Sequence, residues 1–166
     1  ERARVFAQEL DIDTATGVYQ DVLTRNDVDV VYIAAVNTLH ADLIVECLAH
    51  GLHVLCEKPL VTTLDEAHRV IDAAKQYERF CMEALWSRFT PGISHAKQLI
   101  SSGELGELKH ISATYGHAAD LSEITWRLEP GLGSGVLLDL GSYVVSLIHY
   151  LAGDLVSGEA QARTNA

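Results

Sequence analysis

Positive charge is scarce in this sequence of 166 residues, which has 12 lysine and arginine residues against 23 aspartate and glutamate residues. Its formal net charge is −11. Binding to nucleic acid requires clustered basic side chains that neutralise phosphates, and the sequence has no such cluster. We therefore expect no nucleic-acid partner. The hydrophobic share of 48% and the charged share of 21% are typical of a folded globular protein and argue against disorder.

Long apolar runs and paired cysteines are also missing. No uninterrupted apolar stretch reaches the ~18 residues expected of a membrane-spanning helix, and no signal peptide is present, so we expect no membrane partner. Cys47, Cys56 and Cys81 lie in apolar sequence without paired spacing. They predict buried thiols in a reducing compartment, hence a cytoplasmic protein, and neither disulfides nor a zinc site.

An initiating methionine is absent, and the first residues, ERARVFAQEL, have the pattern of the middle of a helix. The last residues, EAQARTNA, contain no closing element. Both features predict a fragment of a longer protein.

Familiar glycine and metal motifs are absent as well. GLGSG at 131–135 is not a dinucleotide fingerprint, because Val136 replaces the third glycine, and it does not match the G-x-S-x-G of a nucleophile elbow. The side chains that could suggest metal ligands fit exposed helix or loop positions better: His40, Asp42, Glu46, His117 and Asp120. We predict no metal site.

The sequence does contain a regular alternation of short apolar strands and amphipathic helices. Strands are predicted over 29–35, 53–57 and 79–85, and helices over 39–51 and 63–77. Gly51 fits just beyond the first helix, and Thr63 with Glu66 forms a capping box for the second. The alternation predicts an α/β fold, part of a Rossmann-type doubly wound parallel sheet with strands buried on both faces and helices on both sides.

The pattern changes near residue 88, where we place a domain boundary between a doubly wound domain over 1–88 and the start of an α+β domain over 89–166. The second domain is predicted to contain a helix over 93–103, a half-exposed strand over 108–116 and a helix over 135–152. Ser134 fits the start of the last helix and Gly153 its end. This helix is apolar nearly all round, so we expect it to be buried.

Ligands in open parallel sheets bind beyond the carboxyl ends of the strands. Two stretches follow predicted strands at that edge, VNTLH at 36–40 and EKP at 57–59. Glu57 and Lys58 would lie on the rim of a ligand crevice, although a bare Glu-Lys pair is more often a solvated loop. Their location favours a site, as does Pro59, which stiffens the backbone and can take a cis bond.

A second candidate pair lies in the apolar helix. Asp139 in this setting has to be hydrogen-bonded or charge-paired, because an isolated buried carboxylate is too costly. Tyr143 follows four residues later and so lies on the same helix face. From the residues alone, a satisfied core aspartate and a functional pair are equally well supported.

Three motifs together resemble one known family. DVDVVYIAAVNTLHADLIVECLAHGLHVLCEKPL resembles the cofactor-domain core of the glucose–fructose oxidoreductase / inositol dehydrogenase / MocA family. MEALWSRFTP and WRLEPGLGSGVLLDLGSYVVSLIHYLAG resemble its transition into the substrate domain. MEALWSRF with LLDLGSY is most similar to the branch that contains dihydrodiol and xylose-type sugar dehydrogenases.

The resemblance implies an oxidoreductase that uses NAD or NADP to transfer hydride between a nicotinamide and a carbinol of a small sugar, polyol or diol. It also implies a homo-oligomer. In the family, a first strand, a Gly-rich loop and a second strand would precede Glu1. The alternatives are a non-catalytic ligand-sensing or regulatory relative of the same fold, or an inert truncated fragment.

By position, the resemblance implies Lys58, Asp139 and Tyr143 as catalytic residues. It implies cofactor contacts from Asn37, His40, Glu57, Lys58, Pro59, Trp126 and Arg127. Our hypothesis makes Tyr143 the acid/base group, and Lys58 the ammonium that stabilises its phenolate and binds the substrate hydroxyl. Asp139 then positions Lys58 and the substrate. Lys58 and Tyr143 can exchange roles in this scheme.

Overall fold

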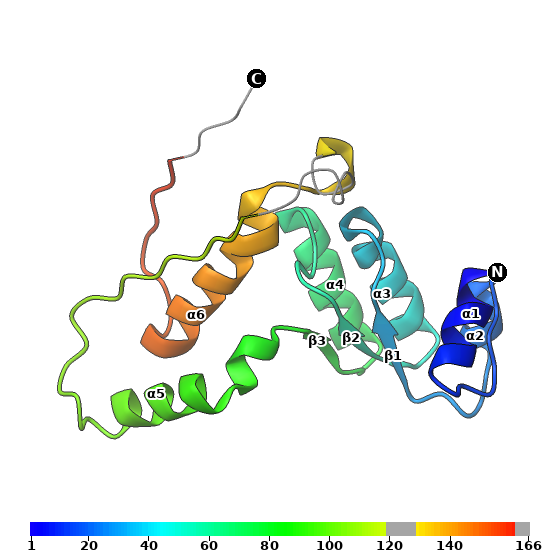
Figure 1. Ribbon diagram of the computed structural model, residues 1–166, viewed down its shortest axis with the longest axis horizontal. Coiled ribbons are helices and arrows are strands. Elements are labelled where there is room, and N and C mark those ends of the chain that lie inside the picture. Colours follow the sequence, from blue (N-terminus) through cyan, green and yellow to red (C-terminus); the bar gives the residue numbers. More distant parts are fainter. Residues whose placement is uncertain (119–128, 162–166) are drawn as a thin grey trace.

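A three-stranded parallel sheet lies in the N-terminal half of the computed structural model, which describes residues 1–118 and 129–161 (Figure 1). The strands are β1 (Val30–Ile33), β2 (His53–Cys56) and β3 (Cys81–Glu83), in that spatial order. The helices of this half are α1 (Arg2–Glu9), α2 (Tyr19–Leu23), α3 (His40–Ala49) and α4 (Leu64–Gln76), with a 3₁₀ turn η1 (Asn37–Leu39) before α3. The predicted α/β class with a parallel sheet is confirmed.

Both crossover helices, α3 and α4, lie on the same face of the sheet (Figure 1). Strands that are added in chain order by right-handed crossovers place each connecting helix on the same side. In β1, Ile33 is buried, whereas Val30 and Tyr32 on the opposite face are 57% and 55% exposed. The expectation that this strand is buried on both faces is therefore wrong for the described residues.

Local sequence fixes one end of each crossover helix. Thr63 Oγ1 accepts a hydrogen bond from the Glu66 N–H at 3.2 Å, and Glu66 Oε2 accepts one from the Thr63 N–H at 3.1 Å. This is the predicted capping box. At the end of α3, Gly51 has φ +80° and its N–H donates to the Leu48 carbonyl at 3.0 Å. The predicted start of α4 and end of α3 are confirmed.

The core lies between the sheet and these two helices. Ile44, Leu48, Val54 and Val70 are at most 2% exposed, and burial of each such side chain contributes about 1.5–3 kcal/mol.

The three cysteines are free thiols, two of them buried. Burial raises the pKa of the Cys56 thiol to about 12, so this thiol is protonated and unreactive near neutral pH.

The C-terminal half consists of helical segments joined by irregular chain. They are η2 (Trp86–Phe89), α5 (Pro91–Ser101), η4 (Pro130–Leu132), the π-helical turn η5 (Leu137–Gly141) and α6 (Ser142–Ala152). The predicted end of the last helix is confirmed, since Gly153 follows α6 with φ +90°. The predicted strand over 108–116 is wrong: these residues are irregular, because alternating polarity forms a strand only beside a partner strand.

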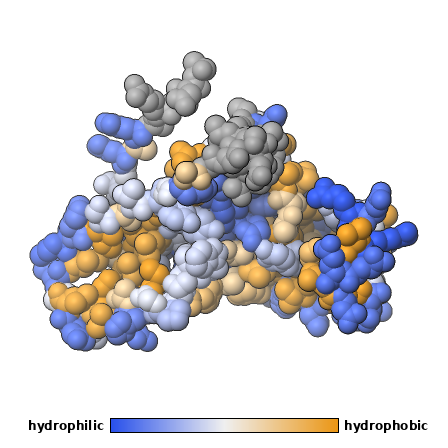
Figure 2. All heavy atoms as spheres, viewed as in Figure 1, coloured by the Kyte–Doolittle hydropathy of each residue, from blue (hydrophilic) through white to orange (hydrophobic). Residues whose placement is uncertain are grey.

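The expected burial of the last helix is also wrong. Leu137 and Val145 are 71% and 51% exposed, and Figure 2 shows apolar side chains gathered over α5 and α6. Among the described elements, η2 and α5 pack against α6, and the apolar residues named above stay exposed. The helix also begins with the π-helical turn, and no side chain caps it, so the predicted cap at Ser134 is wrong.

Candidate active site

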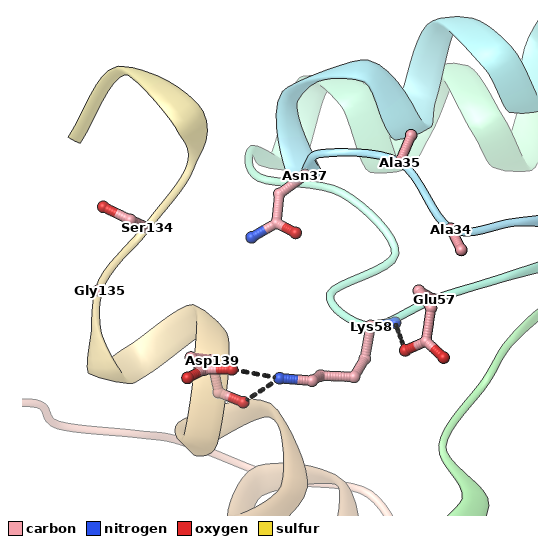
Figure 3. A pocket seen from close by; sticks show the side chains of 8 residues that line it. All are labelled: Ala34, Ala35, Asn37, Glu57, Lys58, Ser134, Gly135 and Asp139. Carbon is pink, nitrogen blue, oxygen red and sulfur yellow. Dashed lines mark hydrogen bonds and ion pairs between the residues drawn. The ribbon is translucent and has the colours of Figure 1, made fainter. Parts of the chain in front are cut away.

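A small cavity lies where the carboxyl ends of β1 and β2 meet the start of the last helical segment (Figure 3). Its volume is about 230 Å³. It is lined by Ala34, Ala35, Asn37, Glu57, Lys58, Ser134, Gly135 and Asp139. The two stretches predicted to border a ligand crevice both contribute, as expected for the carboxyl edge of an open parallel sheet.

The loop after β2 brings Glu57 and Lys58 to this cavity by extending the hydrogen bonds of the sheet. The Glu57 N–H donates to the Ile33 carbonyl at 2.9 Å, and the Glu57 carboxylate accepts bonds from the Tyr32 hydroxyl and from the Lys58 N–H. The hydrogen bond to this carboxylate raises the pKa of Tyr32 to about 12, so the phenol remains a donor near neutral pH. The Lys58–Pro59 peptide bond is cis. Neighbouring groups thus hold Glu57 in place, and Lys58 extends across the cavity (Figure 3).

Lys58 meets Asp139 on the opposite side. Its Nζ lies 2.5 Å from Asp139 Oδ1 and 2.5 Å from the Asp139 carbonyl oxygen. The two side chains are 14% and 26% exposed, so the ion pair is largely shielded from solvent. Asp139 belongs to η5, and π-helical turns occur frequently at functional sites. The expectation that Asp139 is charge-paired is confirmed.

Tyr143 completes this cluster from the next helical turn. The Lys58 Nζ lies 5.1 Å from the centroid of its ring, a cation–π contact. Its hydroxyl accepts a hydrogen bond from Trp86 Nε1 at 3.2 Å, and Tyr115 packs edge-on against its ring with centroids 5.4 Å apart. Tyr143 does not line the first cavity but a neighbouring apolar one of about 170 Å³. The structure therefore brings Lys58, Asp139 and Tyr143 together, with Lys58 in the middle.

Asn37 fastens the glycine-rich segment 131–135 over the cavity. Its Nδ2 donates to the Gly133 carbonyl at 2.8 Å, although Gly133 lies 96 residues away in the sequence. Gly133 has φ +68°, and a Cβ at this position would lie 2.6 Å from Thr62 Cγ2. Only glycine allows so close an approach in this conformation.

The burial of His40 differs from what the sequence predicted. This residue is not on an exposed position of its helix but fully buried, because η1 turns the start of α3 toward the strand ends. Its Nδ1 lies 2.8 Å from the Pro59 carbonyl oxygen and its Nε2 lies 3.1 Å from the Ala35 carbonyl oxygen. It does not line the cavity. Asp42 on the same helix is exposed, as expected, and pairs with Arg69 at 2.6 Å.

Some predicted residues lie outside the described part of the chain, namely Trp126, Arg127 and Asp120.

Sequence reasoning missed two residues that hold the Lys58 loop. Tyr32 binds Glu57, and Glu83 Oε1 accepts a bond from the Leu60 N–H at 2.8 Å. The pairing of Tyr32 with Leu55 places Glu57 diagonally across from Tyr32, a signal that exists only once the strand register is known.

Within residues 1–118 and 129–161, no cluster of three histidine, cysteine or acidic side chains is arranged to hold a metal ion. None of the helices described there has the length and apolar character needed to cross a bilayer.

The fold defines an α/β protein of the Rossmann class with a cavity at the strand ends. The family model of the GFO/IDH/MocA oxidoreductases with an NAD-binding Rossmann fold matches residues 1–85, and that of the GFO/IDH/MocA C-terminal domain matches residues 93–166. The chain belongs to this oxidoreductase family, so the predicted family is confirmed.

Similar proteins support the predicted branch. The chain is 36% identical over 148 residues to trans-1,2-dihydrobenzene-1,2-diol dehydrogenase of Xenopus tropicalis, covering 89% of this chain and 44% of the relative. It is 37% identical over 152 residues to D-xylose 1-dehydrogenase (NADP(+)) 2 of Haloferax volcanii, covering 92% and 46%. The chain thus spans less than half the length of these curated relatives.

Solved structures of similar proteins have the same fold over most of this chain. An oxidoreductase domain protein from Kribbella flavida superposes with a TM-score of 0.85 at 32% identity, over 91% of this chain and 41% of the other. Levoglucosan dehydrogenase in complex with NADH and levoglucosan superposes with a TM-score of 0.79 at 31% identity, over 92% and 42%.

Proposed function

We propose that this chain forms part of a dehydrogenase or reductase that transfers hydride between NAD or NADP and a carbinol carbon of a sugar, polyol or diol. The observation that carries the proposal is the contact of Lys58 with Asp139 across the cavity at the strand ends, with Tyr143 against the ammonium. In this proposal residues 1–88 belong to the cofactor domain, and residues 89–166 begin the substrate domain.

The cavity fits one end of a dinucleotide. Its volume of about 230 Å³ is below the ~300–1,000 Å³ of sites that enclose drug-sized ligands, so it accommodates a ring and not a whole cofactor. Ala34 and Ala35 leave space at the ends of the strands, and Asn37 and Glu57 supply an amide and a carboxylate. These residues, with Pro59, would hold the nicotinamide end.

A bound nicotinamide would supply the site that gives or accepts the hydride. The protein has to exchange the proton of the substrate hydroxyl and to stabilise the charge on its oxygen. Lys58 carries an ammonium beside the cavity, which suits it to bind that oxygen, and Asp139 fixes the direction of the ammonium. The indole N–H of Trp86 donates to the Tyr143 oxygen and so fixes the position of this hydroxyl.

Two assignments of the proton-transfer group follow. Tyr143 takes this role if the substrate hydroxyl reaches its phenol oxygen. The position of Lys58 in the cavity wall, which Tyr143 does not share, supports the second assignment, in which Lys58 itself exchanges the proton.

The test is an absorbance assay for reduced nicotinamide with the complete gene product. NAD and NADP are each combined with trans-dihydrobenzenediol, D-xylose, levoglucosan and simple polyols. We expect turnover with at least one pair. Cofactor binding by calorimetry without turnover across the panel would instead support a non-catalytic sensor.

The same titration with residues 1–166 alone measures whether this part of the protein binds NADH. We expect weak or no binding, because the chain spans less than half the length of its relatives.

The cytoplasmic location and the homo-oligomer expected from the sequence also belong to this proposal. Light scattering of the complete protein would measure its mass and so test the oligomeric state.

A further inference from the structure

His40 is a fully buried imidazole to which the proposed chemistry gives no part. It begins α3 with an exposed fraction of 0%. Its two ring nitrogens lie 2.8 Å from the Pro59 carbonyl oxygen and 3.1 Å from the Ala35 carbonyl oxygen. Ala35 follows β1 and Pro59 follows β2, so the ring bridges the two strand ends that border the cavity.

Both partners of the ring are acceptors, so the imidazole acts as a hydrogen-bond donor. A neutral ring carries one N–H and satisfies one carbonyl, whereas an imidazolium satisfies both. The contact from Nδ1 to Pro59 is the shorter of the two. A buried carbonyl that loses its donor is destabilised, and a backbone segment then moves to find another one.

The backbone around Lys58 is also held on either side of the contact between His40 and the Pro59 carbonyl. Before it, the Glu57 N–H donates to the last carbonyl of β1 at 2.9 Å. After it, the Leu60 N–H donates to Glu83 at 2.8 Å. The imidazole binds the Pro59 carbonyl between these two points. Because the Lys58 side chain leaves from this segment, a shift of the Pro59 carbonyl also shifts its ammonium.

We infer that His40 is a positioning residue that fixes the Lys58 loop through the Pro59 carbonyl. It touches neither the cavity nor the ammonium and acts through the backbone alone. Its effect on turnover rests on the proposed function. Its effect on the loop does not, so the two are measured separately.

The test compares three variants of the complete gene product. In His40→Asn the amide nitrogen takes the place of Nδ1 and keeps the bond to Pro59. In His40→Gln the amide nitrogen of the longer side chain reaches the place of Nε2, so it keeps the bond to the Ala35 carbonyl and loses the bond to Pro59. His40→Leu removes both donors. Ile44→Val, another change in a fully buried α3 side chain, is the packing control because it leaves the loop contacts intact.

The first readout is hydrogen exchange at the backbone amides of Glu57, Lys58 and Leu60 without ligand. We expect exchange to be ~10-fold faster or more in His40→Leu, nearly as fast in His40→Gln, and within ~3-fold of wild type in His40→Asn and in the packing control. The second readout is steady-state kinetics. We expect kcat to fall in the same order, with little change in the KM for the cofactor.

Wild-type exchange in all three His40 variants would overturn the inference. So would equal exchange in the Asn and Gln variants, because the ring would then act through packing. If His40→Leu does not fold, the Asn and Gln pair decides alone. If the wild-type protein turns over no substrate, the proposed function fails, while the order of exchange rates still tests the positioning.

Discussion

Lys58 illustrates how much a single residue depends on its neighbours at this site. Its ammonium meets two oxygens of Asp139 at 2.5 Å and the face of the Tyr143 ring at 5.1 Å. The carboxylate fixes where the charge lies, and the ring shields one side of it from water. A Glu-Lys pair in a loop is commonly solvated, but here the Lys58 side chain is 14% exposed.

Removal of one oxygen atom tests the role of Tyr143. Tyr143→Phe keeps the ring against Lys58 but deletes the hydroxyl. If Tyr143 is the proton-transfer group, kcat of the complete protein should fall ~10²–10⁴-fold with cofactor affinity little changed, because general acid–base catalysis contributes about that much. Tyr115→Phe, the same change on the neighbouring ring, should leave kcat nearly unchanged. A near-normal rate in Tyr143→Phe would assign the proton transfer to Lys58.

The Lys58–Asp139 pair also makes a prediction about stability. Asp139→Asn keeps the side-chain shape and removes the charge, which leaves a largely shielded ammonium without its carboxylate. We expect a loss of about 1–3 kcal/mol in the free energy of unfolding, somewhat less than the 3–5 kcal/mol of fully buried pairs. Urea denaturation of residues 1–166 would measure it.

The matched control is the exposed pair on the crossover helices. Asp42 and Arg69 are 2.6 Å apart, close to the 2.5 Å of the Lys58–Asp139 pair, but their side chains are 72% and 53% exposed. Asp42→Asn should cost under about 1 kcal/mol. Equal losses in the two variants would show that the Lys58 pair gains nothing from its shielding.

At the scale of elements, the capping box predicted from local sequence was confirmed, whereas the predicted cap at Ser134 and two predictions that depend on distant partners were wrong. The Thr63 capping box involves residues within one helical turn, so its pattern alone places it. The strand over 108–116 needs a neighbouring strand, and alternation of polarity says nothing about one. Burial of α6 likewise depends on what packs around it, which its own apolar residues do not determine.

Some features of the candidate site could likewise be predicted from the sequence and others could not. The alternation of strands and helices places Glu57 and Lys58 at a strand end, and the cost of burying a carboxylate predicts that Asp139 has a partner. The sequence does not reveal that this partner is Lys58, 81 residues away, except by resemblance. The burial of His40 depends on how η1 turns the chain, which no periodicity describes.

The hydrogen bond from Tyr32 to Glu57 links two adjacent strand ends and makes folding stability sensitive to alkaline pH. It raises the pKa of Tyr32 from the usual 10.0 to about 12. The unfolded chain therefore loses this proton at lower pH than the folded one. The stabilisation is fully present below pH 10 and is lost as the pH rises from about 10 to 12.

Tyr32→Phe removes this contribution. We expect the variant to be less stable than wild type at neutral pH and the difference to shrink between about pH 10 and pH 12. Urea denaturation of both proteins across this range would measure the difference. Because Tyr32 is 55% exposed, solvent screening keeps the effect small. A difference that stays constant with pH would show that the phenol acts through packing alone.

At the scale of the whole molecule, two of the contacts between the N- and C-terminal halves lie at the cavity. One is the Lys58–Asp139 ion pair, and the other is the bond from Asn37 to the Gly133 carbonyl at 2.8 Å. Both join the strand ends to the segment that starts the last helix. The cavity wall therefore exists only while the halves are in contact, so its shape is sensitive to changes at either contact.

Gly133 is a position where this sensitivity can be tested. A Cβ there would lie 2.6 Å from Thr62 Cγ2, and φ of +68° is unfavourable for any side chain. Gly133→Ala should push the segment away from Asn37, lower kcat/KM of the complete protein by ~10-fold or more and destabilise it by about 1–3 kcal/mol. Steady-state kinetics and urea denaturation measure the two effects.

Two further variants separate the clash from other causes. Gly131→Ala is the matched control, because Gly131 lies in the same segment, has no positive φ, and would have no atom within 4 Å of an added Cβ. It should leave kcat/KM unchanged. Thr62→Ser removes the clashing methyl while keeping the hydroxyl bond to Glu66. In the Gly133→Ala background it should restore part of kcat/KM, since the strain from φ remains. If Gly133→Ala behaves like Gly131→Ala, contact between the halves at Asn37 is not what shapes the cavity.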